Sequence, residues 1–591
     1  MFAKSEPSVR LRWPSLFIGL LLLTTLAWGE DQTPEAPSGW TPKKAVTSGR
    51  DMVAAANPLA VETGYRILRE GGNAIDAAVA VQMVLNLVEP QSSGLGGGAF
   101  ILFHNGRNGL LTSYDGRETA PAAAREDRFL GSDGKPLRFF DAVVGGKSVG
   151  VPGTLRALEL AHRQYGKLPW AKLFEPAIEL AERGFTVSSR LSLLIATEKD
   201  RFRQERARAY FLNPDGSPLA VGQTLRNPQL AATLKRVAAE GADAFYKGSI
   251  AADIVETVRS PATNPGDMTE ADLANYKAKV REPVCGRYRG WRVCGMPPPS
   301  SGGITVLQIL GVLEPFDLHA IGVESLISVH LFSEAGRLAF ADRDRYLADP
   351  EFVTAPPGLT DPAYLRQRSA LIRIDASMGR AAAGVPPAAA KKKAAWLDLG
   401  ADTALEFPST SHICIVDRYG NALSMTTTIE WAFGSHLMTR SGFLLNNELT
   451  DFSFVAVDDG KPVANRIEPG KRPRSSMAPT IVYDDKGRLY AVAGSAGGPA
   501  IINDVTKVLL GILDWNLDPQ AAVDLPNMGS RNGPTELERN TAAAALEPKL
   551  RALGHDTRLM TDTSGLSVIV RRNERWAAGS DPRREGTAKG N

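Results

Sequence analysis

Apolar residues along the chain follow two different spacings, and each spacing predicts a type of element. Six segments place them three or four residues apart, as on one face of an α-helix: residues 60–70, 74–88, 153–165, 170–183, 324–347 and 500–513. Shorter apolar and β-branched runs indicate strands at residues 99–104, 411–416, 422–428, 480–483, 489–493 and 566–571. Because blocks of helices flank blocks of strands, we expect an α+β fold in which helices are layered over sheets.

The second and third of these strands are separated only by a polar turn, so we expect them to form a hairpin. A four-residue loop at 418–421 would place Asp417 opposite Ala422. The same register puts Thr428 beside Thr410, to within one step. A hydroxyl at the head of a strand with a second hydroxyl beside it suits a nucleophile and its hydrogen-bond partner.

Threonine is a poor nucleophile at its own pKa and needs a base. One solution is the α-amine that Thr410 would acquire if the chain were cut after Ser409. The pKa of such an amine is about 7.7–8.0, close to the pH at which a general base works best. Serine and threonine are common in hairpins, so the pair does not by itself establish catalysis.

The composition is that of a large globular protein. The 591 residues are 43% hydrophobic and 23% charged, which allows a sizeable core. A net charge of +3 gives no reason to expect a nucleic-acid or membrane-surface partner. The seven histidines are scattered without metal-ligand spacing, so we expect no metal and no other cofactor.

A basic N-terminus precedes an apolar run, residues 16–28, that is too short to span a bilayer comfortably. Small Ala27 and Gly29 stand at positions −3 and −1 of a plausible cleavage site. We therefore expect a signal peptide at residues 1–29 and an exported protein, periplasmic or secreted, with no stable membrane partner. An uncleaved signal anchor is the alternative, because Trp28 is bulky near that site.

Three cysteines occur: Cys285, Cys294 and Cys414. A two-residue hairpin centred on 289–290 would place Cys285 directly opposite Cys294, within disulfide reach. An exported location favours that disulfide, and two reduced thiols are the alternative. Cys414 is expected in the core.

Two glycine-rich segments call for different interpretations. Residues 94–99 match a dinucleotide-binding pattern, but a strand follows them where a helix is needed, so we do not expect nucleotide binding. Residues 494–499 follow a strand and lead into a helix. Their N–H groups suit an oxyanion hole or a phosphate, with a tight turn as the alternative.

Three polar segments could bind a charged substrate. Arg117 is a candidate clamp for a carboxylate, and Ser475 and Ser476 follow a basic, proline-stiffened approach. Residues 446–452 offer acidic groups for an ammonium ion. Each segment alone is typical of a solvated loop.

Together these segments resemble the γ-glutamyltranspeptidase (glutathione hydrolase) family, N-terminal-nucleophile amidases that are made as one chain and cut in two. The resemblance covers nearly all of the exported chain. It is carried by residues 93–98, the Arg117 segment and residues 151–154, 296–303, 410–412, 442–447, 472–477 and 497–498.

The resemblance implies a four-layer αββα sandwich and a precursor cut into a large chain, 30–409, and a small catalytic chain, 410–591. The least structured internal stretch, about 376–407, is then a mobile connector that gives slack to the cleavage site. The two chains are expected to stay associated.

Carried over by position, the resemblance makes Thr410 the nucleophile, with cleavage between Ser409 and Thr410. Thr428 becomes its hydrogen-bond partner, and Gly497 and Gly498 supply the N–H groups of an oxyanion hole. The donor would be a γ-glutamyl compound such as glutathione, and the acceptor would be water, an amino acid or a peptide.

The same resemblance assigns residues to the two charged groups of the glutamyl donor. Arg117, Ser475 and Ser476 would hold its α-carboxylate, and Asp451 with Glu448 would hold its α-amine. These assignments are chemically consistent, because a zwitterion needs cations and donors for one group and carboxylates for the other.

Two features depart from the family pattern. The family usually has Asn at the position of Glu430, and a carboxylate there would oppose a substrate carboxylate unless it is protonated, paired or turned away. The loop at 454–464 is also shorter than the usual lid, so we expect hydrolysis to be favoured over transfer.

Other functions remain open from the sequence. A sister amidase of the same fold, such as a glutaryl or cephalosporin acylase or a poly-γ-glutamate-cleaving enzyme, is the nearest. A non-catalytic binding protein is less favoured, because a scaffold has no need for Thr410, Thr428 and the glycine pair together.

Overall fold

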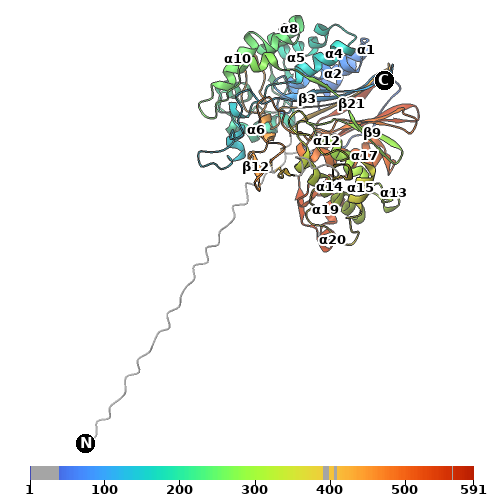
Figure 1. Ribbon diagram of the computed structural model, residues 1–591. Coiled ribbons are helices and arrows are strands. Elements are labelled where there is room, and N and C mark those ends of the chain that lie inside the picture. The colour runs from blue at the N-terminus through green and yellow to red at the C-terminus, as the bar shows by residue number, and fades with distance from the viewer. Residues whose placement is uncertain (2–38, 391–397, 403, 405–406, 408, 562–563) are drawn as a thin grey trace. The chain divides into compact units, whose positions relative to one another are not determined.

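The computed structural model describes Met1 and residues 39–591, apart from 391–397, 403, 405–406, 408 and 562–563 (Figure 1). The expected signal peptide, 1–29, lies outside these residues except for Met1. The described residues from 39 onward belong to one compact unit. None of the helices in the described part is both long and apolar enough to cross a membrane.

Two seven-stranded antiparallel sheets form the centre of this unit. The first sheet has the order β1 (Val46–Ser48), β20 (Arg575–Ser580), β19 (Ser567–Arg572), β15 (Leu489–Gly494), β14 (Thr480–Tyr483), β9 (Trp291–Gly295) and β8 (Val284–Tyr288). The second has the order β21 (Thr587–Gly590), β2 (Met52–Ala55), β10 (Ser411–Val416), β11 (Ala422–Thr428), β3 (Gly98–His104), β4 (Leu111–Gly116) and β7 (Lys279–Arg281).

Helices cover the outer face of each sheet (Figure 1). The second sheet is covered by α1 (Pro58–Arg69), α2 (Ala74–Val88) and α4 (Thr154–Tyr165). The first sheet is covered by α12 (Gly302–Leu313), α17 (Ile501–Leu513) and α18 (Pro519–Asp524), with α14 (Leu326–Tyr346) packed on α12. The inner faces meet where β10 and β11 contact β15.

The alternation of side chains along β10 explains the layering. Ile413 and Ile415 are buried in the cluster that includes α1 and α2, whereas Cys414 and Val416 are buried in the cluster that includes the other sheet. Both faces of this strand are therefore apolar, as a strand between two layers requires. The expected four-layer αββα sandwich and the core position of Cys414 are confirmed.

The described residues form further helices and strands besides these layers. The other helices are α3 (Phe139–Val143), α5 (Glu175–Arg183), α6 (Ser189–Glu198), α7 (Glu205–Phe211), α8 (Pro228–Glu240), α9 (Asp243–Tyr246), α10 (Ser249–Arg259), α11 (Glu270–Asn275), α13 (Leu318–Ile321), α15 (Pro362–Ser369), α16 (Pro387–Ala390), α19 (Ala542–Ala545) and α20 (Glu547–Ala552). The other strands are β5 (Phe185–Thr186), β6 (Thr224–Leu225), β12 (Val457–Asp458), β13 (Lys461–Pro462), β16 (Met528–Ser530), β17 (Thr535–Glu538) and β18 (Thr557–Met560).

The expected register of the β10–β11 hairpin is wrong by one residue. Val416, rather than Asp417, lies opposite Ala422, so the loop has five residues. The side chain of Asp417 causes this, because it is buried and accepts hydrogen bonds from the N–H groups of Tyr419 (2.8 Å) and Asn421 (3.0 Å). The corrected register pairs Ser411 with Thr427, and one further step brings Thr410 level with Thr428.

The cysteine hairpin forms as expected. Cys285 on β8 lies opposite Cys294 on β9, and the two are joined in a disulfide. Arg289 and Gly290 form the two-residue turn with φ of 46° and 88°, the left-handed values that a type I′ turn requires.

Removing the disulfide should lower stability without affecting catalysis. The double variant Cys285→Ser, Cys294→Ala is expected to lose about 2–3 kcal/mol of unfolding free energy, because the bridge closes a short loop. Its activity should persist, since β8 is the edge strand of the first sheet. Chemical denaturation with a parallel activity assay measures both. Free thiols at both positions in exported wild-type protein would contradict the bridge.

The first part of the expected connector is hydrogen-bonded to the body of the molecule. The N–H groups of Ser377 and Met378 donate to the Leu553 carbonyl (2.7 Å) and to Glu334 (2.7 Å). The N–H of Gly384 donates to Asp342 on α14 at 2.7 Å. The slack that was expected from residue 376 onward therefore does not begin there.

Candidate active site

The hydroxyl groups of Thr410 and Thr428 lie 3.5 Å apart and are almost fully buried. Thr410 immediately precedes β10, and Thr428 ends β11. The Thr428 hydroxyl donates to the carbonyl oxygen of Ser409 at 2.7 Å and accepts from the N–H of Glu430 at 2.9 Å. Thr428 thus contacts both the expected nucleophile and the peptide bond expected to be cut.

Arg584, which the sequence analysis missed, holds the other side of Thr410. Its guanidinium donates to the Thr410 carbonyl at 2.9 Å. The Ser409 hydroxyl donates to the Gln91 carbonyl at 2.8 Å, so the residues on both sides of the expected cut are fixed. Arg584 lies 174 residues from Thr410 in the sequence, and no motif connects them.

Arg117 follows β4 and forms ion pairs with both Glu448 and Asp451. Its guanidinium also donates to the carbonyls of Pro473 (3.2 Å) and Arg474 (2.8 Å), which directly precede the serine pair. The structure therefore brings together the groups expected at both ends of a glutamyl substrate. In this state the two acids expected to bind an ammonium ion are paired with the arginine.

Buried carboxyl groups outnumber the cations at this site. Both oxygens of Glu118 and one each of Glu430 and Glu448 receive no hydrogen bond from the described residues. Burial raises the pKa of Glu118 to about 8. Burial also raises the pKa of Glu430 and of Glu448 well above the usual range. Burial therefore opposes ionisation of these carboxyl groups, although Glu448 is also paired with Arg117.

Glu430 belongs to this acidic cluster. The Asn447 amide donates to one of its carboxyl oxygens, and the negative charges of Asp451 and Glu448 act on it. The contact with Asn447 pairs one of its oxygens, and burial raises its pKa, so both effects reduce its opposition to a substrate carboxylate.

Ser475 and Ser476 are held by the loop before α12 and by α14. The N–H of Ser475 donates to the Pro299 carbonyl at 3.1 Å. Arg343 on α14 donates to the Ser476 hydroxyl at 2.6 Å and to Ser301 at 2.9 Å. Arg343 was missed by sequence analysis because its helical spacing is that of an ordinary buried face.

Gly497 and Gly498 lie just after β15, in the sheet that faces β10. Both have left-handed φ values, 134° and 56°, which explains the need for glycine there. Gly494, at the end of β15, lies against the ring of His412, leaving no room for a side chain. No hydrogen bond joins the glycine pair to the threonine pair, so their role as oxyanion donors stays a prediction.

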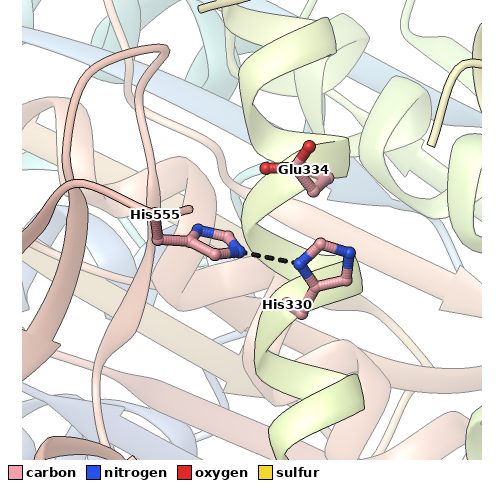
Figure 2. Close-up of side chains that lie close together, drawn as sticks. All are labelled: His330, Glu334 and His555. Carbon is pink, nitrogen blue, oxygen red and sulfur yellow. Dashed lines mark hydrogen bonds between the residues drawn. The ribbon is translucent and has the colours of Figure 1, made fainter. Parts of the chain in front are cut away.

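The described residues contain one group that could hold a metal ion: His330, Glu334 and His555, whose ligand atoms lie within 4.8 Å of one another (Figure 2). His330 Nδ1 and His555 Nε2 are 2.7 Å apart, the spacing of a shared proton. Zinc ligands with bonds near 2.0–2.1 Å would lie about 3.3 Å apart. Arg337 also neutralises Glu334 at 2.9 Å. We interpret the group as a hydrogen-bonded joint between α14 and the segment before β18.

Comparison with known proteins agrees with this site. The family model for gamma-glutamyltranspeptidase matches residues 60–591. The chain belongs to the gamma-glutamyltranspeptidase family. It is 40% identical over 527 residues to the glutathione hydrolase proenzyme of Bacillus subtilis (strain 168), covering 89% of this chain and 88% of the relative.

Relatives in this family also include proteins named as acylases. The chain is 37% identical to the acylase ACY 1 proenzyme of Pseudomonas sp. (strain V22), covering 87% of this chain and 88% of the relative. Among solved structures, the cephalosporin acylase from Bacillus halodurans superposes with a TM-score of 0.81 at 26% identity, covering 94% of this chain and 98% of that one. Family membership therefore establishes the enzyme class, whereas the preferred substrate depends on the residues of the site.

Proposed function

We propose that the protein is an exported, self-processing γ-glutamyl hydrolase and transferase that cleaves the γ-glutamyl amide of glutathione and related compounds through an acyl-enzyme on Thr410. The contact that carries this proposal is the Thr428 hydroxyl, which lies 3.5 Å from the Thr410 hydroxyl and 2.7 Å from the Ser409 carbonyl.

Processing would begin with attack by the Thr410 hydroxyl oxygen on the Ser409 carbonyl carbon. The C–N bond breaks, the Thr410 nitrogen takes the hydroxyl proton, and an ester joins the two residues. Water then hydrolyses the ester and restores the hydroxyl. The Thr428 hydroxyl is aimed at the carbonyl oxygen, where negative charge develops, and this supports cleavage between Ser409 and Thr410.

Turnover would use the same hydroxyl with the new α-amine of Thr410 as the base. The Thr410 hydroxyl gives its proton to the α-amine and its oxygen adds to the γ-carbonyl carbon of the donor, while Gly497 and Gly498 offer N–H groups to the oxyanion. The amide C–N bond then breaks, the protonated α-amine returns the proton to the leaving amine, and the glutamyl group remains on Thr410 as an ester. Water, an amino acid or a peptide then takes the glutamyl group. Water is favoured because the segment expected to form a lid is only the short hairpin of β12 and β13, whose first residue Val457 is exposed.

The donor's charged groups match the chemistry around Arg117. Its α-carboxylate would meet Arg117, Ser475 and Ser476, and its α-amine would meet Asp451 and Glu448. Export is proposed on the N-terminal apolar run and is supported by the disulfide of Cys285 and Cys294, a bond favoured outside the cytosol.

An acylase for glutaryl or cephalosporin substrates is the second candidate, because proteins named as an acylase and as a cephalosporin acylase are similar to this chain. The buried acids argue against it. A glutaryl group has no ammonium ion, so it would leave Asp451 and its neighbours without a cation beyond Arg117.

The direct test is to incubate purified protein with γ-glutamyl-p-nitroanilide and to analyse it on a denaturing gel with N-terminal sequencing. We expect release of p-nitroaniline and two chains, the smaller beginning at Thr410. A protein that is cleaved there but inactive on this compound would argue for the acylase. A single inactive chain would contradict the proposed chemistry.

A further inference from the structure

Residues 581–586 form the loop that joins β20 in the first sheet to β21 in the second, and this loop carries Arg584. The Arg584 guanidinium donates to the Thr410 carbonyl at 2.9 Å. The shape of the loop therefore determines how the expected nucleophile is held. Because residues 581–586 lie outside both strand ladders, their carbonyl groups need donors from elsewhere in the chain.

Lys43, near the start of the described chain, supplies three of these donors. Its ammonium donates to the carbonyl oxygens of Asp581 (2.5 Å), Arg584 (2.7 Å) and Gly586. A lysine ammonium has three N–H donors and no acceptor, so the three carbonyls use all of its hydrogen-bonding capacity. Because the contacts extend from the first residue of the loop to the last, Lys43 fixes the curvature of the loop.

The residues just before Lys43 bind the same loop. The N–H of Thr41 donates to the Pro582 carbonyl at 2.8 Å. The Arg583 guanidinium lies over the ring of Trp40, 4.9 Å from its centroid. The N-terminal segment 40–43 is therefore attached to the loop at several points, and Lys43 makes the contact that includes Arg584 itself.

The charge of Lys43 strengthens these contacts. The residue is half-buried, and burial lowers the pKa of Lys43 to about 8, while Asp581, Asp524 and Glu585 act in the opposite direction. At pH 7 the side chain is therefore mostly protonated. Hydrogen bonds from a charged donor are roughly twice as strong as neutral ones, so one side chain can hold the loop.

We propose that Lys43 is a positioning residue for both reactions of Thr410 and that it acts through Arg584. Lys43 holds the 581–586 loop, and the loop holds the guanidinium on the Thr410 carbonyl. The Thr410 hydroxyl attacks in self-cleavage and again in turnover, so a small displacement of this residue slows both reactions. This inference rests on the proposed function, because it assumes that Thr410 is the nucleophile. It extends that function by naming a residue that supports the nucleophile from the N-terminal part of the chain.

The test removes the ammonium and then restores it. For γ-glutamyl-p-nitroanilide at pH 7, we expect Lys43→Cys to lower kcat per processed chain roughly tenfold to a hundredfold. KM should stay within about twofold of wild type, because the three carbonyls that Lys43 contacts belong to none of the residues expected to bind the donor. Self-cleavage, followed on a denaturing gel, should also slow. Alkylation of the introduced thiol with 2-bromoethylamine rebuilds a side chain of lysine's length that ends in an ammonium, and it should restore most of kcat.

The cysteines of this chain permit selective alkylation. Cys285 and Cys294 are joined in a disulfide, and Cys414 is buried, so the reagent should modify only the introduced thiol. Mass spectrometry verifies a single addition, and treated wild type should keep its rate. Lys44→Cys is the matched control, because Lys44 is the next residue and is exposed. It should match wild type before and after treatment.

The outcomes separate this role from the proposed function. A Lys43→Cys protein with the kcat of wild type, a loss confined to KM, or a loss that alkylation does not restore would overturn the role of Lys43. In each of these cases wild type would still hydrolyse γ-glutamyl-p-nitroanilide. Wild type that neither cleaves itself nor hydrolyses this compound would instead show that the proposed function fails.

Discussion

Replacing Thr410 with alanine is expected to leave one uncleaved chain with no measurable γ-glutamyl hydrolase activity. The variant lacks the only oxygen that the mechanism uses to attack the Ser409 carbonyl, and it lacks the acyl-enzyme oxygen as well. The large effect follows from this double use of one atom. A denaturing gel and a p-nitroaniline assay report the two losses separately.

Ser411→Ala is the matched control for this experiment. Ser411 is the next residue, is buried and has a hydroxyl without a hydrogen-bond partner among the described residues. Its loss should leave both processing and turnover near wild type. A Thr410→Ala protein that is still cut and still active would disprove the mechanism, and equal damage in both variants would indicate a folding defect.

The sequence predicted the strands around the nucleophile because both are short runs of apolar and β-branched residues between polar segments. The bounds of β10 and β11 agree to the residue. The register failed by one step because it depended on Asp417, whose carboxylate captures the N–H groups of the turn. Loop length is set by such local side-chain hydrogen bonds, which a hydrophobic pattern does not contain.

The disulfide could be predicted because the register of its hairpin, unlike that of the β10–β11 hairpin, is determined by the turn itself. A two-residue turn at Arg289 and Gly290 leaves only one register, and that register determines the partner of each cysteine. By contrast, His330 and His555 meet across 225 residues of sequence. Their scattering gave no indication of contact, because the packing of distant segments is a property of the whole fold.

The candidate site residues were predicted from the family resemblance, which does not predict their electrostatic state. The position of Glu430 in the sequence suggested an obstacle to a substrate carboxylate. Its pKa is raised by burial and by the charges of Asp451 and Glu448, which come together only when the segments are folded. The sequence identifies such titratable groups, whereas their charge depends on their surroundings in the folded protein.

Asp451→Asn is expected to remove most of the preference for γ-glutamyl over glutaryl substrates. Glutaryl-p-nitroanilide retains the carboxylate of the donor but lacks its α-amine, so the comparison isolates the ammonium ion. A hydrogen bond to a charged group contributes about 1.5–3 kcal/mol, which corresponds to a change of roughly tenfold to 150-fold in relative kcat/KM.

The variant should also change the glutaryl reaction itself. Asp451 is paired with Arg117, so the amide of asparagine would leave more of the arginine's charge for a substrate carboxylate. We therefore expect γ-glutamyl hydrolysis to fall while glutaryl hydrolysis is unchanged or increases, a crossing that general damage to the site cannot produce. Asp485→Asn, at an exposed position, should leave the ratio at its wild-type value. Equal wild-type rates on the two compounds, or a preference that survives Asp451→Asn, would assign this member of the family to the acylases.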